Sequence, residues 1–182
     1  YLKTQRLILR EMKTDEAALL FDLDSDPEVM KYLKGGATST MEMCEDAARR
    51  ICEYASRYNH KMGLWLAEEK ETGDFIGWFI LRPDKKNPDA ENPELGYRLK
   101  KKFWGKGYAT EVSLALIEKA FVELNCKSVF AIAMTANLAS QHVMKKVGMK
   151  IVGNYEQNEC FAPGNDISAV EYVIKKDEWK ST

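Results

Sequence analysis

The chain opens with one short strand and then takes on helical spacing. Arg6–Arg10 is an apolar run between two arginines, and it predicts a first strand. Thr14 is placed to cap the next segment, whose first turn carries acidic residues that suit a helix dipole. Asp26 followed by Pro27 predicts a second helical turn, because aspartate is a good cap and proline fits the first helical position.

A long amphipathic segment follows a predicted helix start. Ser39 and Glu42 have the spacing of a capping box, in which each side chain accepts a free backbone N–H of the other residue. We therefore expect a helix from this point to about Tyr58. Apolar residues recur along it at helical spacing, and we interpret them as a core stripe: Met43, Ala47, Ile51, Tyr54 and Tyr58.

The middle of the chain changes from helical to extended spacing. Leu64–Ala67 and Phe75–Leu81 are rich in aromatic and branched residues and flank the turn sequence Thr72–Asp74, so they predict a β-hairpin. Its large aromatic side chains are expected in the core: Trp65, Trp78 and Phe79. Residues 82–93 hold three prolines and several charges, which indicates a loop, and Glu94–Leu99 predicts the next strand.

Helices and strands alternate in the last part of the chain. Helical spacing returns over Tyr108–Leu124, and Val129–Met134 is apolar on both faces, which favours a central strand. Another helix is predicted over Asn137–Val147, with Gly148 suited to its left-handed end. Two closing strands are expected: Lys150–Tyr155 and Ser168–Lys175. This order predicts an α+β fold with three layers, α/β/α, in which helices flank a mixed, mostly antiparallel sheet.

Composition restricts the class of protein without identifying one. At 182 residues, 45% hydrophobic and 30% charged, the chain is long enough to bury a core, and we expect a single domain over residues 1–182. The net charge of −1 argues against nucleic acid or an anionic membrane as partner, and no apolar run approaches a membrane span. Four cysteines without a C-x-x-C pair and two distant histidines predict no metal site. Reduced cysteines and the lack of a signal-peptide pattern favour a cytoplasmic protein.

The most informative stretch runs from a strand into a helix through two glycines. Gly105 and Gly107 allow a tight backbone turn, after which the free N–H groups of the first helical turn point into one small space. The helix dipole makes this space suitable for an anion, and Lys101, Lys102 and Lys106 add positive charge, so a pyrophosphate is a natural ligand. Neither a Walker loop nor G-x-G-x-x-G is present. These residues alone therefore leave open a simple glycine-rich connection beside exposed lysines.

In its wider context this turn resembles the pyrophosphate loop of the GNAT acetyltransferases, specifically of their RimJ/RimL-like branch. The family loop reads Arg/Gln-x-x-Gly-x-Gly/Ala, and Trp104–Ala109 reads W-G-K-G-Y-A, with tryptophan first, as is common in this branch. Other segments similar to the branch follow in the expected order: Thr4–Arg10, Asp26–Met30, Asn137 with Ser140, and Lys146–Met149. The resemblance covers nearly the whole chain.

The resemblance implies a GNAT fold with a splayed sheet, with acetyl-CoA as co-substrate and an amine as acceptor. In the family, the pantetheine arm fills the gap beside the strand before the loop as if it were an added strand. Carried over, pantetheine would contact Tyr97, Arg98 and Leu99. The pyrophosphate would bind the amides of Trp104, Gly105, Lys106, Gly107, Tyr108, Ala109 and Thr110. Asn137 and Ser140 would lie near pantetheine or the thioester, and Lys145 or Lys146 near the nucleotide.

Acetyl transfer needs an oriented amine, a base for its proton, and stabilisation of the leaving thiolate. Glu94 is the candidate base, acting through a water, although a carboxylate at a loop edge is an equally simple interpretation. Ser140 is the candidate donor to the thiolate, or else a helix serine bonded to its own backbone. Many GNAT members place a tyrosine seven residues after the asparagine as the acid, but Met144 stands there. Either Ser140, Tyr97 or water takes this role, or CoA leaves unaided.

Three functions remain to be separated. An active N-acetyltransferase is the leading hypothesis, a non-catalytic acyl-CoA-binding or sensing module is the alternative, and a nucleotide-triphosphate-binding protein is disfavoured by the absent Walker pattern. The acceptor stays open between a protein N-terminal α-amine, as on ribosomal proteins, and a small amine. Some relatives pair as homodimers. One acidic group either attracts a cationic acceptor or forms a solvated helix face: Asp22, Asp24, Asp26 and Glu28.

Overall fold

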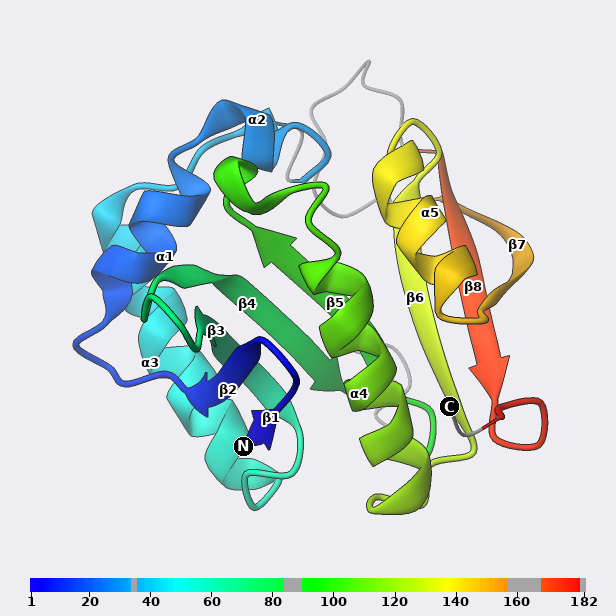
Figure 1. Cartoon of the computed structure of the whole chain (residues 1–182). Helices are drawn as coiled ribbons and strands as arrows, with labels where there is room; N and C mark the ends of the chain where they lie inside the picture. Colours follow the sequence, from blue (N-terminus) through cyan, green and yellow to red (C-terminus); the bar gives the residue numbers. More distant parts are fainter. Residues whose placement is uncertain (34–35, 84–89, 157–167, 181–182) are drawn as a thin grey trace.

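Eight strands form one sheet in the computed structural model, which describes residues 1–33, 36–83, 90–156 and 168–180. Their order across the sheet is β1-β2-β3-β4-β5-β6-β8-β7 (Figure 1). The strands are β1 (Leu2–Lys3), β2 (Leu7–Glu11), β3 (Gly63–Glu69), β4 (Phe75–Arg82), β5 (Glu94–Leu99), β6 (Ser128–Met134), β7 (Lys150–Glu156) and β8 (Ser168–Lys175). The helices are α1 (Ala17–Asp24), α2 (Pro27–Met30), α3 (Met41–Arg57), α4 (Tyr108–Val122) and α5 (Leu138–Lys146), with a 3-10 turn, η2 (Lys101–Phe103).

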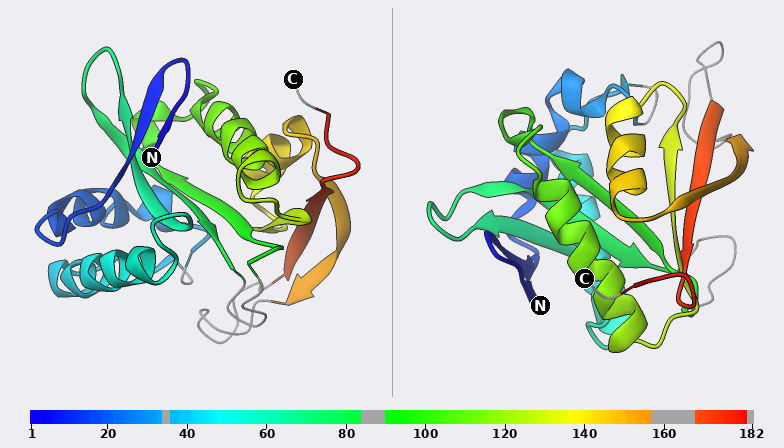
Figure 2. Two further views of the ribbon diagram at one scale, coloured as in Figure 1. Left: turned by 90° about the horizontal axis from the view of Figure 1, so that it is seen from below. Right: turned by 45° about the vertical axis from the view of Figure 1, so that its right-hand side comes forward.

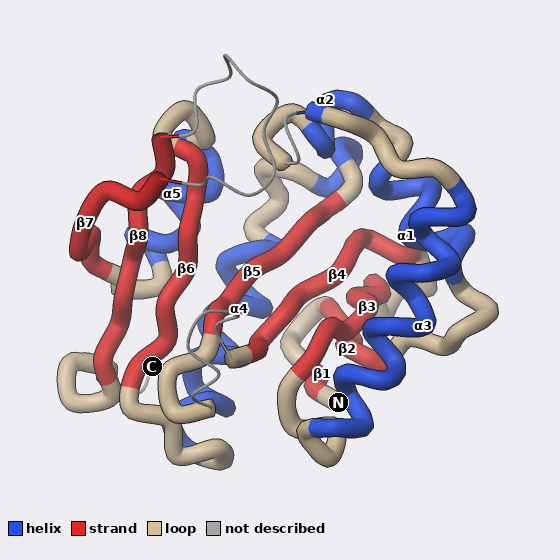
Figure 3. The backbone as a smooth tube through the Cα atoms, turned by 180° about the vertical axis from the view of Figure 1, so that it is seen from behind, coloured by secondary structure: helices blue, strands red, loops and turns tan. Residues whose placement is uncertain are grey.

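Helices cover both faces of the sheet, which confirms the predicted α+β fold. α1 and α3 lie on one face, and α4 and α5 lie on the other (Figures 2 and 3). The larger core lies mainly between the sheet and α4, around Trp65, Phe79 and Phe121. A smaller core, around Leu23 and Leu66, lies under α1 and α3. No helix in the described ranges is long and apolar enough to cross a membrane.

The sheet is split between β5 and β6, its one parallel neighbour pair among the described strands. These two strands share a single register position, Glu94 with Phe130, whereas the pairing of β4 with β5 runs from Arg82–Glu94 to Gly77–Leu99. Beyond Glu94 the two strands diverge (Figure 1). The splayed sheet that the resemblance implied is therefore present.

Most predicted boundaries agree with the structure within two residues, but two helix starts differ. The N-cap of α3 is Thr40, whose hydroxyl accepts the Met43 N–H at 3.3 Å, so the capping box predicted at Ser39 is wrong by one residue. Ser39 is buried, and its N–H donates to the Asp24 carbonyl at 3.1 Å, which holds it outside the helix.

The predicted core stripe of α3 is confirmed in part. Met43 is 46% exposed rather than buried. Ala47 and Ile51 of the predicted stripe do pack on the smaller core, beside Cys44 and Ala48, which the stripe left out. Tyr58, also predicted, packs against the larger core.

The start of α1 and the first strand pair also differ from expectation. Thr14 does not cap α1, which begins at Ala17 after Glu16. The Glu16 carboxylate accepts the Lys13 N–H at 2.8 Å and binds Arg10 of β2, so this loop is organised by an ion pair rather than a hydroxyl cap. β1 was not predicted, because a two-residue strand has no detectable period. Part of the predicted loop over residues 82–93 and one of the four cysteines, Cys160, lie outside the described residues.

Candidate active site

A cleft of about 860 Å³ opens where β5 and β6 separate. Its walls come from β5, the glycine turn, the first turns of α4, β6 and α5. It brings together the site residues predicted from the sequence, apart from Lys101, Lys102, Lys106 and Lys145: Glu94, Tyr97, Arg98, Leu99, Trp104, Gly105, Gly107, Tyr108, Ala109, Thr110, Asn137, Ser140 and Lys146. Residues 43 positions apart in sequence, such as Tyr97 and Ser140, are thereby in contact.

The glycine turn has the backbone conformation that its sequence requires. Gly105 and Gly107 have φ values of +74° and +83°, in the left-handed region where glycine carries little steric penalty. Gly107 is the N-cap of α4 and supplies no side-chain acceptor. The N–H groups over residues 108–110 therefore have no acceptor within the helix, which leaves a ready anion site that the helix dipole strengthens.

Trp104 and the nearby lysines contribute less to this anion site than the sequence suggested. The Trp104 N–H already donates to the Lys101 carbonyl at 3.1 Å, and the Trp104 indole donates to the Leu99 carbonyl at 2.8 Å. The Lys106 ammonium lies over the Phe103 ring, 5.3 Å from its centroid, and does not line the cleft.

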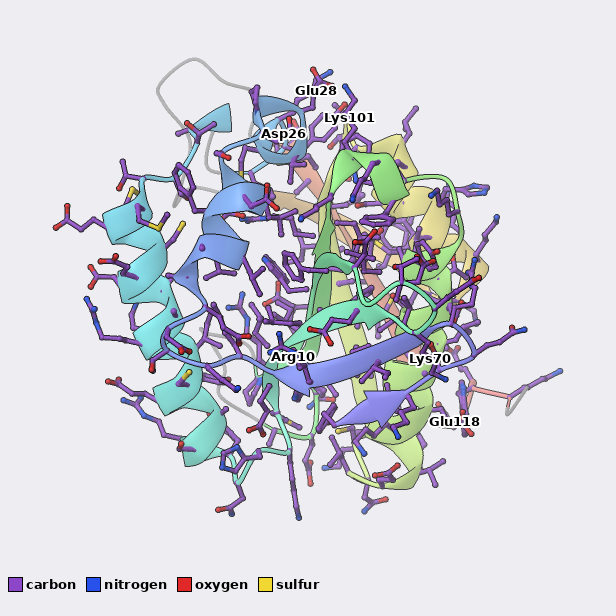
Figure 4. The ribbon with its side chains drawn as sticks, turned by 60° about the vertical axis from the view of Figure 1, so that its left-hand side comes forward. Arg10, Asp26, Glu28, Lys70, Lys101 and Glu118 are labelled. Carbon is purple, nitrogen blue, oxygen red and sulfur yellow. The ribbon has the colours of Figure 1, made fainter. Side chains whose placement is uncertain are left out.

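Positive charge reaches the cleft from a different lysine of the predicted set. Lys146 lines it from the last turn of α5. The two lysines ahead of the glycine turn have acidic partners instead. Lys101 Nζ lies 3.8 Å from Glu28 Oε2, and Lys102 Nζ lies 3.6 Å from Asp74 Oδ2. Figure 4 shows Glu28 and Lys101 close together.

The edge of β5 presents free backbone groups to the gap. In an antiparallel pair, alternate residues direct both backbone groups at the partner strand. The Lys100 N–H donates to the Ile76 carbonyl at 2.9 Å. The backbone N–H and C=O groups of even-numbered residues in β5 therefore point toward β4, and those of odd-numbered residues point away from it. The Phe130 N–H accordingly reaches the Pro93 carbonyl at 3.1 Å. By the same alternation, the N–H and C=O of Tyr97 face the opening, where an extended ligand arm can pair with them.

A hydroxyl pair spans the gap from β5 to α5. The Tyr97 hydroxyl donates to Ser140 Oγ at 3.3 Å. Ser140 is oriented by Asn137, the N-cap of α5, whose Oδ1 accepts the Ser140 N–H at 3.1 Å. Burial raises the pKa of Tyr97, and its hydrogen bond to Ser140 lowers it by less. Tyr97 therefore keeps its proton at neutral pH and can donate it.

Glu94 lies at the closed end of the gap, at the position that joins β5 to β6. Its Oε2 accepts from Arg82 Nε at 2.9 Å and lies 2.8 Å from Arg82 Nη2. Both side chains are partly exposed and line the cleft. The carboxylate is thus fixed within the site rather than free at a loop edge.

Two lining residues escaped the sequence reasoning. Ser113 is fully buried on α4, and among the described atoms its Oγ has no hydrogen-bond partner although it lines the cleft. An unpaired buried hydroxyl costs about 1–3 kcal/mol, so it indicates a ligand group. The sequence offered one sign of this residue, a serine among the buried apolar residues of α4. Trp78, expected in the core with Trp65 and Phe79, is half-buried: it packs against the smaller core and also lines the cleft. The Arg98 guanidinium lies 4.9 Å from its ring centroid.

The acidic residues of α1 and α2 are paired rather than free. Asp24 forms a buried ion pair with Arg98, and Asp22 pairs with Lys100. Together with Glu28 and Lys101 they connect the helical layer to β5 and η2. The Arg98 guanidinium is therefore held by Asp24. Arg98 still forms part of the cleft wall.

Comparison with known proteins identifies this arrangement. Residues 6–150 match the family described as acetyltransferase (GNAT) domain. The chain belongs to the GNAT family. It is also 33% identical over 190 aligned positions to the FsC-acetyl coenzyme A-N(2)-transacetylase of Aspergillus fumigatus, a match that covers 98% of this chain and 77% of the relative.

Solved GNAT structures share the fold. The protein described as RimL, ribosomal L7/L12 alpha-N-protein acetyltransferase, in complex with coenzyme A, superposes with a TM-score of 0.79 at 16% identity, covering 96% of this chain and 97% of that one. The spermidine N-acetyltransferase of Vibrio cholerae, in complex with CoA and spermine, gives a TM-score of 0.75 at 16% identity, covering 94% and 96%.

This GNAT protein is an acetyl-CoA-dependent N-acetyltransferase, with acetyl-CoA as its co-substrate. The site residues fit that molecule. The unpaired edge of β5 suits the pantetheine arm, and the free amides of the turn suit a diphosphate. The orphaned Ser113 hydroxyl follows these amides on α4 and lines the same cleft. Among the described residues, no cluster of three or more His, Cys, Asp or Glu side chains could hold a metal ion.

Proposed function

We propose that this enzyme acetylates a primary amine by direct attack in a ternary complex, and that it belongs to the RimJ/RimL-like branch. The observation that carries the proposal is the convergence of Glu94 and the Tyr97–Ser140 pair on the cleft that also contains the free amides of the glycine turn. A donor bound along that cleft would bring its thioester to the side chains that handle protons. Bound acetyl-CoA supplies an activated acetyl group, and the chain's own residues do the rest.

The proton steps follow from the placement of these residues. Glu94 takes a proton from the acceptor amine through a water as the new C–N bond forms. Ser140 gives its hydroxyl proton to the sulfur as the C–S bond breaks, and the Tyr97 hydroxyl replaces that proton. Glu94 then releases its proton to water, and water returns a proton to Tyr97, so both groups are restored. Arg82 holds the Glu94 side chain in place through two contacts to Oε2. The Tyr97–Ser140 pair thereby takes the role of the tyrosine that Met144 replaces.

The acceptor side of the cleft favours an amine with apolar surroundings. Carboxylates near this side are paired, Glu94 with Arg82 and Asp24 with Arg98, so no excess of negative charge is available among these residues for a polycation. Apolar and aromatic side chains line the same side: Val29, Tyr32, Leu33, Trp78 and Ile80. We therefore propose a protein or peptide N-terminus, or a small amine attached to an apolar group, in preference to a polyamine.

The RimJ/RimL-like branch supports a protein acceptor. The structural likeness to RimL, named for its alpha-N-protein activity, agrees with the W-G-K-G-Y-A turn and with the Thr4–Arg10 segment. A relative named for N(2)-transacetylation of FsC keeps a small-molecule amine as the second acceptor class to be tested.

A panel of amines tests the proposal. CoA release would be measured with purified protein on short peptides that vary in N-terminal residue, on an aromatic alkylamine and on spermidine, with mass spectrometry of the products. We expect turnover on one of the first two classes, with a higher kcat/KM than on spermidine. Glu94→Gln should lower kcat, while Asp74→Asn, away from the cleft, should not.

A non-catalytic acyl-CoA-binding module is the second candidate. Met144 favours it, because this buried residue lines the cleft where many GNAT members have a proton donor. Tight acetyl-CoA binding without turnover on any amine of the panel would establish this second function and overturn the first.

A further inference from the structure

The segment Thr4–Arg6, between β1 and β2, packs against the back of the glycine turn. Thr4 Oγ1 donates to Glu111 Oε1 at 2.6 Å, and the Arg6 N–H donates to the same oxygen at 2.8 Å. Arg6 Nε donates to Glu111 Oε2 at 2.7 Å. The Glu111 carboxylate, in the first turn of α4, is therefore held by three donors from a segment more than 100 positions earlier in the chain.

The Arg6 guanidinium also contacts the turn on both sides of Gly107. Its Nη1 donates to the Lys106 carbonyl at 2.9 Å, and its Cζ lies 4.4 Å from the centroid of the Tyr108 ring. A Cβ on Gly107 would lie 3.4 Å from Arg6 Nη2. Arg6 is absent from the residues that line the cleft, so it touches the turn from outside the site.

The charge of Glu111 makes this contact consequential. A carboxylate in the first turn stabilises a helix, but it competes with an anionic ligand at the same helix end. Burial raises the pKa of Glu111, yet the hydrogen bonds from Thr4 and Arg6 outweigh it and leave the pKa below its usual value. Glu111 is therefore ionised at neutral pH, and Arg6 is the cation that neutralises it.

We infer that Arg6 is a positioning residue for recognition of the donor's diphosphate. It holds the Lys106 carbonyl away from the cleft, so the N–H groups over residues 107–110 stay directed at the ligand, and it cancels the repulsion from Glu111. The inference rests on the proposed diphosphate site at this turn. It assigns a role to the opening strand segment that acts through the turn rather than by touching the donor.

Two acetyl donors distinguish a role of Arg6 in diphosphate recognition from a role in stabilising the fold. Acetyl-CoA carries the diphosphate, whereas S-acetylpantetheine ends before it and still offers the same thioester. Kinetics would be measured with both donors on the wild type, Arg6→Gln, Arg6→Lys, Glu111→Gln and the double variant Arg6→Gln/Glu111→Gln. Arg10→Gln is the control, because it also removes an arginine from a carboxylate contact near the start of the chain. Arg10 lies on β2, pairs with Glu16 and Glu68, and is remote from the turn. Figure 4 shows Arg10 at one end of β2 and Lys70 near the other.

The expected result is a donor-specific defect. Arg6→Gln should raise KM for acetyl-CoA about tenfold, equivalent to roughly 1.4 kcal/mol, and leave kcat/KM for S-acetylpantetheine within about twofold of wild type. Arg6→Lys should recover part of the loss, and adding Glu111→Gln to Arg6→Gln should recover part of it by removing the repulsive charge. Arg10→Gln should not change the ratio between donors.

The inference would be overturned if Arg6→Gln lowered kcat/KM equally with both donors, and if Arg6→Gln and Arg10→Gln lowered the melting temperature by the same amount. Failure of the underlying site has a different signature. If wild-type protein used both donors equally well, the diphosphate would not be recognised at the turn at all, and the proposed site itself would be wrong.

Discussion

At Gly107 the backbone adopts a left-handed conformation directly ahead of the helix whose free amides face the cleft. Two neighbouring glycines differ in a useful way. A Cβ on Gly105 would meet nothing within 4 Å, whereas one on Gly107 would lie 3.4 Å from Arg6 Nη2. The two positions share backbone strain and differ in crowding, so a pair of alanine variants separates these causes.

Gly107→Ala should weaken CoA binding more than Gly105→Ala. Left-handed backbone costs a residue with a Cβ about 1–2 kcal/mol. At Gly107 the methyl group would also contact the Arg6 guanidinium, 3.4 Å from Nη2, at the first turn of α4. Calorimetry with CoA measures the difference. Gly148→Ala, with φ of +85° outside the cleft, should lower the melting temperature without altering CoA affinity. Equal CoA affinity in the Gly107 and Gly148 variants would contradict the role of the turn.

Tyr97→Phe tests the hydroxyl pair. Without the phenol, Ser140 loses its proton supply, so kcat should fall about tenfold or more at unchanged KM for acetyl-CoA, within the range of general acid catalysis. Ser140→Ala should reduce kcat at least as much. The control is Tyr172→Phe, which removes another buried tyrosine hydroxyl, bonded to Gln141 and away from the cleft. If Tyr172→Phe slowed turnover equally, the effect would be one of packing.

At the scale of elements, local signals predicted most of the fold, and contacts between distant segments account for the rest. β5 and α5 follow from the local pattern of apolar and polar residues. Thr14 was a good local cap candidate, yet the Arg10–Glu16 pair decides where α1 begins. The clamp of Arg6 on Glu111 has no periodic or motif signature, because it joins segments that only the folded sheet brings together.

The same physical limit applied within the candidate site. The glycine turn was readable because backbone conformation depends on local residue type. The unpaired hydroxyl of Ser113 and the exposure of Trp78 could not be predicted from the sequence. Both depend on how distant elements pack around the cleft. Likewise, the charges of Asp22 and Asp24 were visible in the sequence, but their lysine and arginine partners were not.

The contact between the opening segment and α4 should depend on pH in a defined direction. The pKa of Glu111 is lowered in the folded protein, so its ionised form contributes stability above its unfolded pKa, about 4.3, and this contribution is lost as the pH falls through the folded value. Urea unfolding at pH 7 and near pH 3 measures it. The stability difference between wild type and Glu111→Gln should shrink at the lower pH. A difference that stays constant would argue against the ion pair as its source.

At the scale of the whole molecule, the helical layer of α1 and α3 is fastened to the split sheet through Asp24. Its carboxylate and the Arg98 guanidinium are both about nine-tenths buried, next to the Trp78 ring. Removing one partner leaves a buried charge unpaired, which is much more costly than losing an exposed pair. The neighbouring pair of Asp22, which is 61% exposed, and Lys100 offers a comparison on the same helix.

Asp24→Asn should therefore destabilise the protein by about 3–5 kcal/mol, because the Arg98 charge would be left unpaired. Asp22→Asn should cost about 0–1 kcal/mol, as expected for an exposed pair. Chemical denaturation of the two variants beside wild type checks both values. Similar small losses in both would show that water reaches Arg98 and that this pair does not fasten the two layers.

The single register position that joins β5 to β6 has a consequence beyond catalysis. A donor molecule bound between β5 and β6 can form the backbone hydrogen bonds that these two strands do not form with each other. Binding of the donor therefore also stabilises the folded sheet. At a hundredfold excess over its dissociation constant, such a ligand adds about 2.7 kcal/mol to the folded state. The enzyme loaded with acetyl-CoA should therefore resist proteolysis for longer than the free enzyme.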